Sequence, residues 1–395
     1  MYSKLNLFLL FSNFVNNIYC DYLLVQKPPI VEIYSNSFLQ KFNIKRLAIF
    51  DTNQPSLPYV IYTITNEHFT QYFEEIKNSF YIEYDQTIKL NQTQTITTSY
   101  SQFSQSTVPW HLDRIDSDSL DGMFHYNSSG SCHTNTSVVI DTYIIDTGID
   151  INHPQFNGRA KWLANYANDG IDTDGNGHGT HCSGLVGSIQ YGVCKDANMY
   201  AIKVLDSEGS GSLSGVIKGI EHAFNSHVTK HNAFSGVKDI KSIISMSLGG
   251  SFSRILNRAV QNCIERSDSF YIVVASGNEN SDACKTSPAS VDGVFSVMAS
   301  NIYDERAYFS NFGKCTTMYS PGVNVESTIP NGKSAVYSGT SMATPILAGV
   351  LNHYIDMYPH MNLQNIKNKI ATDAQKNFIK NNKKNTKNLF ISIRR

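Results

Sequence analysis

The sequence lacks both a charge imbalance and a long apolar run, and each absence excludes a class of function. Its 395 residues carry a formal net charge of −1, so the charge does not point to nucleic acid or to an acidic partner. No apolar stretch is long enough to span a bilayer as a helix, so we expect no transmembrane segment. Hydrophobic residues make up 41% and charged residues 16%, a balance typical of globular proteins.

The first 20 residues have the pattern of a secretory signal peptide. Lys4 precedes an apolar stretch at 5–11, which is too short for a membrane helix but suits a signal peptide. The alternative is a buried N-terminal strand. We expect cleavage near Cys20 and secretion from the cell. Three sequons fit this route as glycosylation sites, at Asn91, Asn127 and Asn135.

Residues 21–90 have the pattern of a compact α+β unit. A helix with one apolar face is expected at 67–78, and strands are expected at 21–26, 59–64 and 81–85. Residues 91–107 are rich in Gln, Thr and Ser, a composition that cannot bury a core. We therefore predict a linker at 91–107, between a small domain and a larger one, where a protease would cut.

From residue 108 the chain alternates apolar strands with helices. Strands that are apolar throughout and separated by helices predict a parallel sheet covered on both faces. In such a sheet, ligands bind beyond the carboxyl ends of the strands. The expected strands are 138–146, 200–205, 242–248 and 270–275, and the expected helices are 179–188, 214–226 and 253–265. The sequence therefore predicts an α/β domain at 108–395.

Ser341 lies where small residues give way to an apolar run with helical spacing. A serine near a helix N-terminus faces unpaired N–H groups, which favour a developing negative charge. That setting suits a nucleophile attacking a carbonyl. Taken alone, an ordinary helix-capping serine explains Ser341 better. The rest of the chain changes this balance, because it supplies an Asp, a His and an Asn in suitable settings.

Asp146 ends an apolar strand and is followed by Thr-Gly, so its carboxylate can be held rigid against an imidazole. A turn or capping role is the alternative. His178 stands between glycines at an expected helix start, where other backbone can approach its ring. His178 and His181 are spaced for a metal, but no third ligand is near, so we predict no metal site. The order Asp146, His178, Ser341 occurs among known catalytic triads.

Three motifs together resemble those of the subtilisin-like serine proteases. They are Asp-Thr-Gly at 146–148, Gly-His-Gly-Thr-His at 177–181 and Gly-Thr-Ser-Met-Ala-Thr-Pro at 339–345. The branch that the chain is most similar to is that of proteinase K, over residues 108–393. The resemblance implies a subtilisin-like three-layer fold with a mostly parallel central sheet. It also implies that residues 21–90 are an inhibitory propeptide.

The resemblance assigns a role to each residue of the site. Ser341 is implied as the nucleophile, His178 as the general base and then acid, and Asp146 as the orienting carboxylate. Asn278 is similar to the side-chain donor of the oxyanion hole, which acts with the backbone N–H of Ser341. For Asn278 taken alone, an Asx turn is the alternative.

The resemblance also implies where a polypeptide substrate binds. It would add as an extended strand beside 209–213 and 247–249. We expect broad specificity, with an apolar or aromatic residue before the cut, because no acidic residue in these stretches points into the first pocket. The expected substrate-binding residues are Gly209, Ser210, Gly211, Leu213, Ser247, Leu248, Gly249, Ala275, Ser276 and Gly277.

Seven cysteines are present, and six remain if Cys20 leaves with the signal. Six cysteines allow 15 connectivities, so their spacing alone assigns no pair. The resemblance implies a disulfide between Cys284 and Cys315 and a free thiol, Cys182, beside the triad. Cys182 would make the enzyme sensitive to mercurials. Cys132 and Cys263 are considered as a further pair, which leaves Cys194 without an explanation.

Calcium is considered at two places, and no cofactor is expected for the chemistry. The site of the proteinase K branch, near Pro288, would lack its carboxylate because Thr317 stands where the relatives have Asp. Asp169, Asp172 and Asp174 form an acidic loop that would suit Ca²⁺, with an ordinary polar loop as the alternative.

Together these features predict a secreted, monomeric serine endopeptidase that is made as a zymogen. Its own propeptide would inhibit it, and cleavage within 91–107 would release activity. The alternative is a protease-fold binding or regulatory protein that keeps its propeptide, and such a protein would carry a damaged triad. An esterase or lipase would more often carry Gly-x-Ser-x-Gly, which the residues around Ser341 lack.

Overall fold

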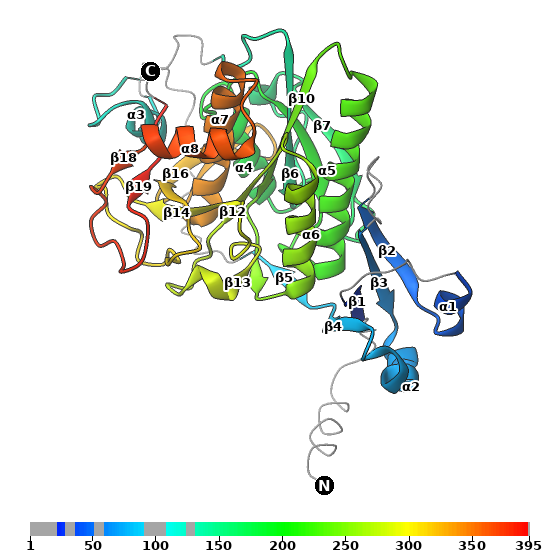
Figure 1. Cartoon of the computed structure of the whole chain (residues 1–395). Coiled ribbons are helices and arrows are strands. Elements are labelled where there is room, and N and C mark those ends of the chain that lie inside the picture. The colour runs from blue at the N-terminus through cyan, green and yellow to red at the C-terminus, as the bar shows by residue number, and fades with distance from the viewer. Residues whose placement is uncertain (1–21, 28–35, 51–58, 91–107, 124–130, 394–395) are drawn as a thin grey trace.

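The computed structural model describes residues 22–27, 36–50, 59–90, 108–123 and 131–393 (Figure 1). It shows a small N-terminal unit, residues 22–90, packed against a large unit, residues 108–393. The expected signal peptide and the expected linker at 91–107 lie outside the described residues. Among the described helices, none is both apolar enough and long enough to cross a membrane.

The N-terminal unit is an antiparallel sheet with two helices on one face. The strands lie in the order β2-β3-β1-β4. Their bounds are β1 Tyr22–Gln26, β2 Lys45–Phe50, β3 Tyr59–Ile64 and β4 Phe80–Tyr84, and the helices are α1 Asn36–Lys41 and α2 Asn66–Ile76. Side chains on β1 alternate, as a pleated strand requires: Tyr22 and Leu24 pack in the unit's own core, and Leu23 and Val25 pack in a core of the large unit.

The large unit is built on a sheet of nine described strands in the order β18-β19-β15-β14-β12-β10-β6-β8-β7. Neighbouring strands pair in parallel except β18 and β19, which are antiparallel. The central strands are β6 Val138–Asp146, β8 Asn198–Lys203, β10 Asp239–Met246 and β12 Phe270–Ala275. The outer strands are β7 Ala160–Asn165, β14 Phe295–Ser300, β15 Met318–Pro321, β18 Gln375–Lys376 and β19 Leu389–Phe390.

Helices cover both faces of this sheet. Alternate residues of β6 enter different cores: Ile144 packs with the cluster that contains α4 and α7, and Ile145 with the cluster that contains α5 and α6. The predicted parallel sheet with two covered faces is therefore confirmed. The helices are α3 Trp110–Asp116, α4 His178–Gly187, α5 Leu213–Ala233, α6 Arg254–Arg266, α7 Thr340–Met357 and α8 Leu363–Asp373.

Six short strands of the described residues form two-stranded sheets outside the two main sheets. They are β5 Thr87–Lys89, β9 Ser210–Ser212, β11 Gly250–Ser251, β13 Thr286–Ser287, β16 Val325–Ile329 and β17 Lys333–Tyr337. Strand β5 belongs to the N-terminal unit but pairs with β9 of the large unit. Adjacent strands β12, β10, β6 and β8 all end at the same edge of the large sheet, which is where the candidate site lies.

Candidate active site

Asp146 is the last residue of β6, and its side chain is buried. Its Oδ1 accepts hydrogen bonds from the Thr147 backbone N–H and from His178 Nδ1, both at 2.7 Å. Because a carboxylate can only accept, the contact fixes the imidazole with its proton on Nδ1 and a lone pair on Nε2. That Nε2 is buried and has no hydrogen-bond partner among the described residues, so it is able to take a proton.

His178 is the first residue of α4, and glycines on either side make its position possible. Gly177 precedes it with a φ of 100°, a left-handed conformation that suits glycine. A Cβ on Gly179 would lie 2.1 Å from the backbone oxygen of Gly148. Only glycine therefore lets the start of α4 approach the loop that follows β6, which brings His178 to Asp146.

Asp174 ties the start of α4 to the end of β6. Its Oδ1 accepts from the Gly177 N–H and the Thr147 hydroxyl, both at 2.8 Å. Its Oδ2 accepts from the Thr180 N–H at 2.9 Å and from the Thr180 hydroxyl at 2.6 Å. A carboxylate in this position caps the helix and complements its dipole. Because Thr147 adjoins Asp146, these bonds hold both residues of the His–Asp pair.

Burial and charge act in opposite directions on His178. Burial disfavours the imidazolium, but the Asp146 carboxylate favours it by charge and by hydrogen bond and holds the pKa of His178 well above its ordinary value. The neighbouring His181 has no such carboxylate, and burial lowers its pKa to about 3. His178 is therefore equipped to gain and hold a proton, and His181 stays neutral.

Ser341 is the second residue of α7, and its hydroxyl donates to the backbone oxygen of Ser247 at 3.2 Å. The hydroxyl of Ser247 donates in return to the backbone oxygen of Ser341 at 2.8 Å. The Cys182 thiol donates to the same oxygen at 3.5 Å and lies 3.8 Å from His178 Nδ1. Asp146 and His178 are thus in direct contact, Cys182 lies against both His178 and Ser341, and the Ser341 hydroxyl is bonded to Ser247.

Asn278 lies just after β12, and its side-chain oxygen is committed to α7. Its Oδ1 accepts from the N–H and the hydroxyl of Thr340, both at 2.9 Å. Because a backbone N–H only donates, this bond fixes which end of the amide is oxygen. A Cβ built on Gly339 would lie 3.5 Å from Asn278 Nδ2 and 3.5 Å from the Ser341 backbone nitrogen. Two N–H donors therefore flank the space beside Gly339.

A cavity of about 410 Å³ lies beside Ser341. All six residues predicted for substrate binding at the ends of β10 and β12 line it, together with Asn278: Ser247, Leu248, Gly249, Ala275, Ser276 and Gly277. Sequence reasoning missed Glu279 and Lys285, whose exposed side chains also line the cavity. Glu279 directly follows Asn278, and this proximity in sequence was the signal available for finding it.

The predicted residues at 209–213 contact the N-terminal unit. Strand β5 pairs with β9 in an antiparallel register, and Lys89 also forms a bridge with Gly249. Beyond the paired strand, the Leu90 N–H donates to the Gly209 oxygen and the Leu213 N–H to the Gln86 oxygen, both at 2.9 Å. The segment 86–90 therefore fills the gap between the two edges that were predicted to bind substrate.

Comparison with known proteins identifies the family. A profile described as the subtilase family matches residues 138–390, more than half of the chain. The chain belongs to the subtilase family. It is 44% identical over 289 residues to alkaline protease 2 of Aspergillus fumigatus, with 71% of this chain and 55% of that protein covered. It is 45% identical over 265 residues to the subtilisin-like serine protease Pen c 2 of Penicillium citrinum, with 65% and 56% covered.

A solved structure agrees with this assignment. The crystal structure of a cold-adapted subtilisin-like serine proteinase superposes with a TM-score of 0.65 at 34% identity, over 73% of this chain and 98% of that chain. The chain spans a little over half the length of alkaline protease 2 and of Pen c 2.

The acidic loop of this subtilase does not fit a calcium ion. Both oxygens of Asp174 already accept hydrogen bonds from the chain. Asp169 lies 3.1 Å from the buried ammonium of Lys203, which would repel a cation. That ammonium also donates to the backbone oxygens of Thr147 and Leu205 at 3.0 and 2.7 Å. The Lys203 ammonium thus supplies the positive charge beside Asp169.

The second place considered for calcium has Thr317 where the relatives have a carboxylate. The Thr317 hydroxyl accepts from the Ser296 N–H at 3.1 Å and donates to the Val294 oxygen at 3.4 Å. The Lys367 ammonium donates to the same oxygen at 3.1 Å. A neutral hydroxyl and a nearby ammonium do not make a site for a divalent cation.

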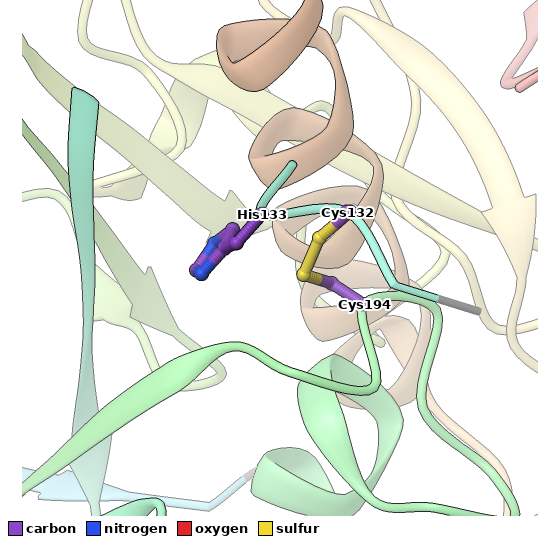
Figure 2. Close-up of side chains that lie close together, drawn as sticks. All are labelled: Cys132, His133 and Cys194. Atoms are coloured by element: carbon purple, nitrogen blue, oxygen red, sulfur yellow. A yellow bond between two sulfur atoms is a disulfide. The ribbon is translucent and has the colours of Figure 1, made fainter. Parts of the chain in front are cut away.

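Two disulfides lie in the described residues of this subtilase. One joins Cys284 and Cys315, and the other joins Cys132 and Cys194 (Figure 2). The interpretation that Cys132 pairs with Cys263 is therefore wrong, because Cys263 is a buried free thiol on α6. Cys182 is also free and buried. Burial raises the pKa of the Cys182 thiol, so the thiol stays protonated.

The remaining residues singled out from the sequence are His181 and the asparagines of the three sequons. His181 donates from Nε2 to the Ala335 oxygen at 3.0 Å and stacks on Tyr337, so its ring is used for packing. Asn135 is half-buried, and its side-chain oxygen accepts from the N–H and hydroxyl of Ser137. Asn91 and Asn127 lie outside the described residues.

Proposed function

We propose that this chain is a serine endopeptidase that is made as an inhibited precursor and secreted. The observation that carries the proposal is the 2.7 Å hydrogen bond between His178 Nδ1 and buried Asp146, beside a cavity lined by Ser341 and Asn278. The bond leaves His178 Nε2 as a base, and the cavity gives a peptide bond room to reach the Ser341 hydroxyl.

Acylation begins when a peptide adds as a strand between β9 and residues 247–249. The Ser341 hydroxyl rotates from the Ser247 oxygen, loses its proton to His178 Nε2, and attacks the scissile carbonyl. Asp146 keeps the tautomer and stabilises the imidazolium that forms. The raised pKa of His178 follows from the same contact.

The tetrahedral oxyanion would be stabilised by the N–H of Ser341 and by Asn278 Nδ2. Both donors flank the space beside Gly339, and Asn278 is held from its oxygen end by Thr340. Donors that are already oriented need no reorganisation as the charge develops. The start of α7 adds its helix dipole to the same charge.

Collapse of this intermediate completes the first half of the reaction. The His178 imidazolium gives its proton to the leaving amine, and the Ser341 acyl ester remains. Water then enters, and His178 Nε2 takes one of its protons as the oxygen attacks the ester. The second collapse returns the proton to Ser341 and releases the new carboxylate, so His178 acts as base and acid in each half.

The N-terminal unit supports the precursor part of the proposal. Segment 86–90 lies where a substrate strand would lie. Glu83 accepts from the backbone N–H of Arg254 at 2.8 Å at the start of α6, and Asp85 accepts from the N–H of Ser214 at 2.8 Å at the start of α5. The inhibitor therefore caps two helices of the enzyme. Cleavage within 91–107, downstream of the bound strand, would free the enzyme.

Specificity is proposed from the cavity walls. Leu248, Ala275 and Gly277 give it small and apolar surfaces, which supports an apolar or aromatic residue before the cut. Glu279 and Lys285 add opposite charges at exposed positions of the rim. Cleavage of a peptide library would test this directly, and a strict requirement for Arg or Lys would contradict it.

The test of the function combines labelling with N-terminal sequencing. The full chain and its Ser341→Ala variant are expressed through a secretory pathway and treated with a fluorophosphonate probe. We expect the secreted wild type to be labelled at Ser341 and to have lost the N-terminal unit. We expect the variant to be unlabelled and to remain uncut.

One result would favour the second candidate, a binding or regulatory protein that keeps its propeptide. That candidate is favoured by the filled cleft, in which β5 pairs with β9, one of the edges expected to bind substrate. Secreted wild type that is neither labelled nor cut, even after the N-terminal unit is removed by limited proteolysis, would contradict the peptidase.

A further inference from the structure

Residues 131–135, which we call the clasp, run across the ends of two helices. On one side, Asp196 accepts from three donors of the clasp: the Ser131 hydroxyl, the Cys132 N–H at 2.9 Å and the His133 N–H at 3.2 Å. Burial disfavours the charged form of Asp196, but these bonds outweigh burial and hold its pKa below the ordinary value. The clasp is therefore fixed here by charge-assisted hydrogen bonds.

On the other side, the clasp is fixed to α7. Asp356 accepts from the N–H and hydroxyl of Thr134 at 3.0 and 2.7 Å and from the Asn135 N–H at 3.0 Å. His133 Nε2 donates to Asn352 Oδ1 at 3.0 Å, and the amide nitrogen of Asn352 donates to the helix backbone, which fixes its orientation. Five consecutive residues thus bond to two aspartates and one asparagine.

The loop that carries Asp196 is itself attached to α4. The Cys194 N–H donates to the Val186 oxygen at 2.9 Å, and the Val193 N–H donates to the Leu185 oxygen at 3.2 Å. These oxygens belong to the last turn of α4, whose carbonyls have no partner within the helix. Cys194 is therefore part of the C-terminal cap of α4, the helix that begins with His178.

The disulfide between Cys132 and Cys194 closes this arrangement (Figure 2). In the figure the disulfide joins the clasp to the loop after α4, and the His133 ring points away from the sulfur atoms. We propose that the clasp is a redox-locked link between the helices that carry His178 and Ser341, and that the Cys132–Cys194 bond sets their relative position. The part of this inference that concerns activity rests on the proposed function.

Close packing is what would carry an effect from the clasp to the site. A Cβ built on Gly349 of α7 would lie 2.6 Å from Val193 Cβ and 3.2 Å from the Val186 oxygen. The two helices therefore touch, without intervening space, beside the end of α4 that the disulfide holds. Close-packed elements move as units rather than deforming locally, so a shift at this end also moves the end that bears His178.

The chemistry of the lock is thiol–disulfide exchange. As the Sγ–Sγ bond forms, the two cysteine thiols give up two electrons and two protons to a small disulfide such as oxidised glutathione, which is reduced to two thiols. In reverse, a thiolate of dithiothreitol attacks one sulfur, the other leaves as a thiolate that takes up a proton, and ring closure of the reagent releases the second thiol. The lock would therefore form in an oxidising compartment and stay open in a reducing one.

The experiment uses the mature enzyme with a Cys132→Ala/Cys194→Ala double substitution. The rate of fluorophosphonate labelling and the kcat and KM for a peptide substrate are measured together with hydrogen exchange. A 1 Å misplacement of catalytic groups lowers the reaction rate on the order of 10²-fold, and a smaller misplacement lowers it less. We therefore expect kcat and the labelling rate to fall by roughly threefold to tenfold, with KM unchanged. Exchange should rise in the last turns of both α4 and α7.

Two controls keep the test decisive. Cys263→Ala removes a buried free thiol, and it should change neither labelling nor exchange in α4 and α7. If the double variant fails to fold, a Cys284→Ala/Cys315→Ala enzyme keeps Cys132–Cys194 as the one disulfide of the described residues. Dithiothreitol should then slow its labelling, and oxidised glutathione should restore the rate.

Faster exchange confined to residues 131–135, with unchanged labelling and kcat, would overturn the proposal. Exchange that rises in both helix tails, in a protein whose wild type is never labelled, would support the link but contradict the proposed peptidase. The two inferences can therefore fail separately.

Discussion

The two sheets of this protein are covered in different ways. The large parallel sheet has helices of its own unit on both faces. Ile144 enters a core built from residues 108–393, and Ile145 enters a core that also includes a few residues of the N-terminal unit. The N-terminal sheet has its own helices on one face only. Its other face, with Leu23 and Val25, packs against α5 and α6 of the large unit.

This difference shows which unit depends on the other. A sheet with one uncovered apolar face cannot bury enough surface to offset the entropy of ordering a small chain. The N-terminal unit therefore relies on the large unit to cover one face of its sheet. As the proposed inhibitor, this unit should keep its structure while it is bound and lose it once it is cut and released.

The largest expected effect comes from breaking the site while leaving both units folded. Asp146→Asn removes the charge that holds the pKa of His178 above its ordinary value. We expect kcat to fall on the order of 10⁴-fold, as the same change does in the trypsin-type triad, because the wrong tautomer is favoured. Circular dichroism and affinity for the N-terminal unit should not change, since neither depends on the His–Asp pair.

The pH profile of the wild type tests the same contact. Catalysis needs neutral His178, and its pKa is raised, so kcat/KM should rise with pH through a midpoint above 6.5. In Asp146→Asn the raising cause is gone and burial remains, so the residual activity should have a lower midpoint. If the acid side of the pH profile has the same midpoint in Asp146→Asn as in the wild type, Asp146 does not control the pKa of the imidazole.

The next effect concerns the N-terminal unit alone. A peptide of residues 21–90 would expose Leu23, Val25, Ala48 and Ile61, which pack against the large unit in the intact chain. We expect its far-ultraviolet spectrum to be mainly that of an unfolded chain, and to gain structure when mature enzyme carrying Ser341→Ala is added. A peptide that unfolds cooperatively on its own would contradict this reliance on the large unit.

How much of this could be predicted from sequence differs between the two units. The strands at 138–146 and 270–275 match β6 and β12 because a continuous apolar run ends in polar or glycine-rich residues. In the N-terminal unit, β2 was missed, because its residues Lys45–Phe50 mix charged and apolar side chains without alternation. Burial alone does not decide this, because residues 59–64 match β3 of the N-terminal unit, and the fully buried strand β14 of the large unit was missed.

The site was partly predictable for a similar reason. Asp146, His178, Ser341 and Asn278 each stand at a strand or helix end that the sequence marks with glycines. The pairing of Cys132 with Cys194 could not be predicted, because spacing does not choose among connectivities. Strand β5 has only three residues, and its place is set by pairing with β9, a contact that leaves no pattern along the chain.

A smaller effect would come from weakening the contacts that hold the inhibitor. Glu83→Gln and Asp85→Asn remove the charges that cap α6 and α5. Loss of a helix cap costs about 0.5–2 kcal/mol, so each change should raise the inhibition constant of the N-terminal unit by roughly twofold to thirtyfold. Glu75→Gln, at an exposed position of α2, is the matched control. Equal constants for all three variants would mean that the caps do not hold the inhibitor.

The smallest expected effect is that of a chelator on the mature enzyme, and it tests whether the large unit is self-sufficient. In the acidic loop, the Lys203 ammonium bonds to Asp169 and to the backbone oxygens of Thr147 and Leu205, so the chain supplies its own cation next to Asp146. Melting temperatures with and without the chelator should coincide. Lys203→Met should lower the melting temperature, because Asp169 and two carbonyls would lose their partner. Added calcium should restore part of the lost melting temperature only if the loop can accept an ion. A chelator that lowers the wild-type melting temperature would show that a cation other than Lys203 supports this unit.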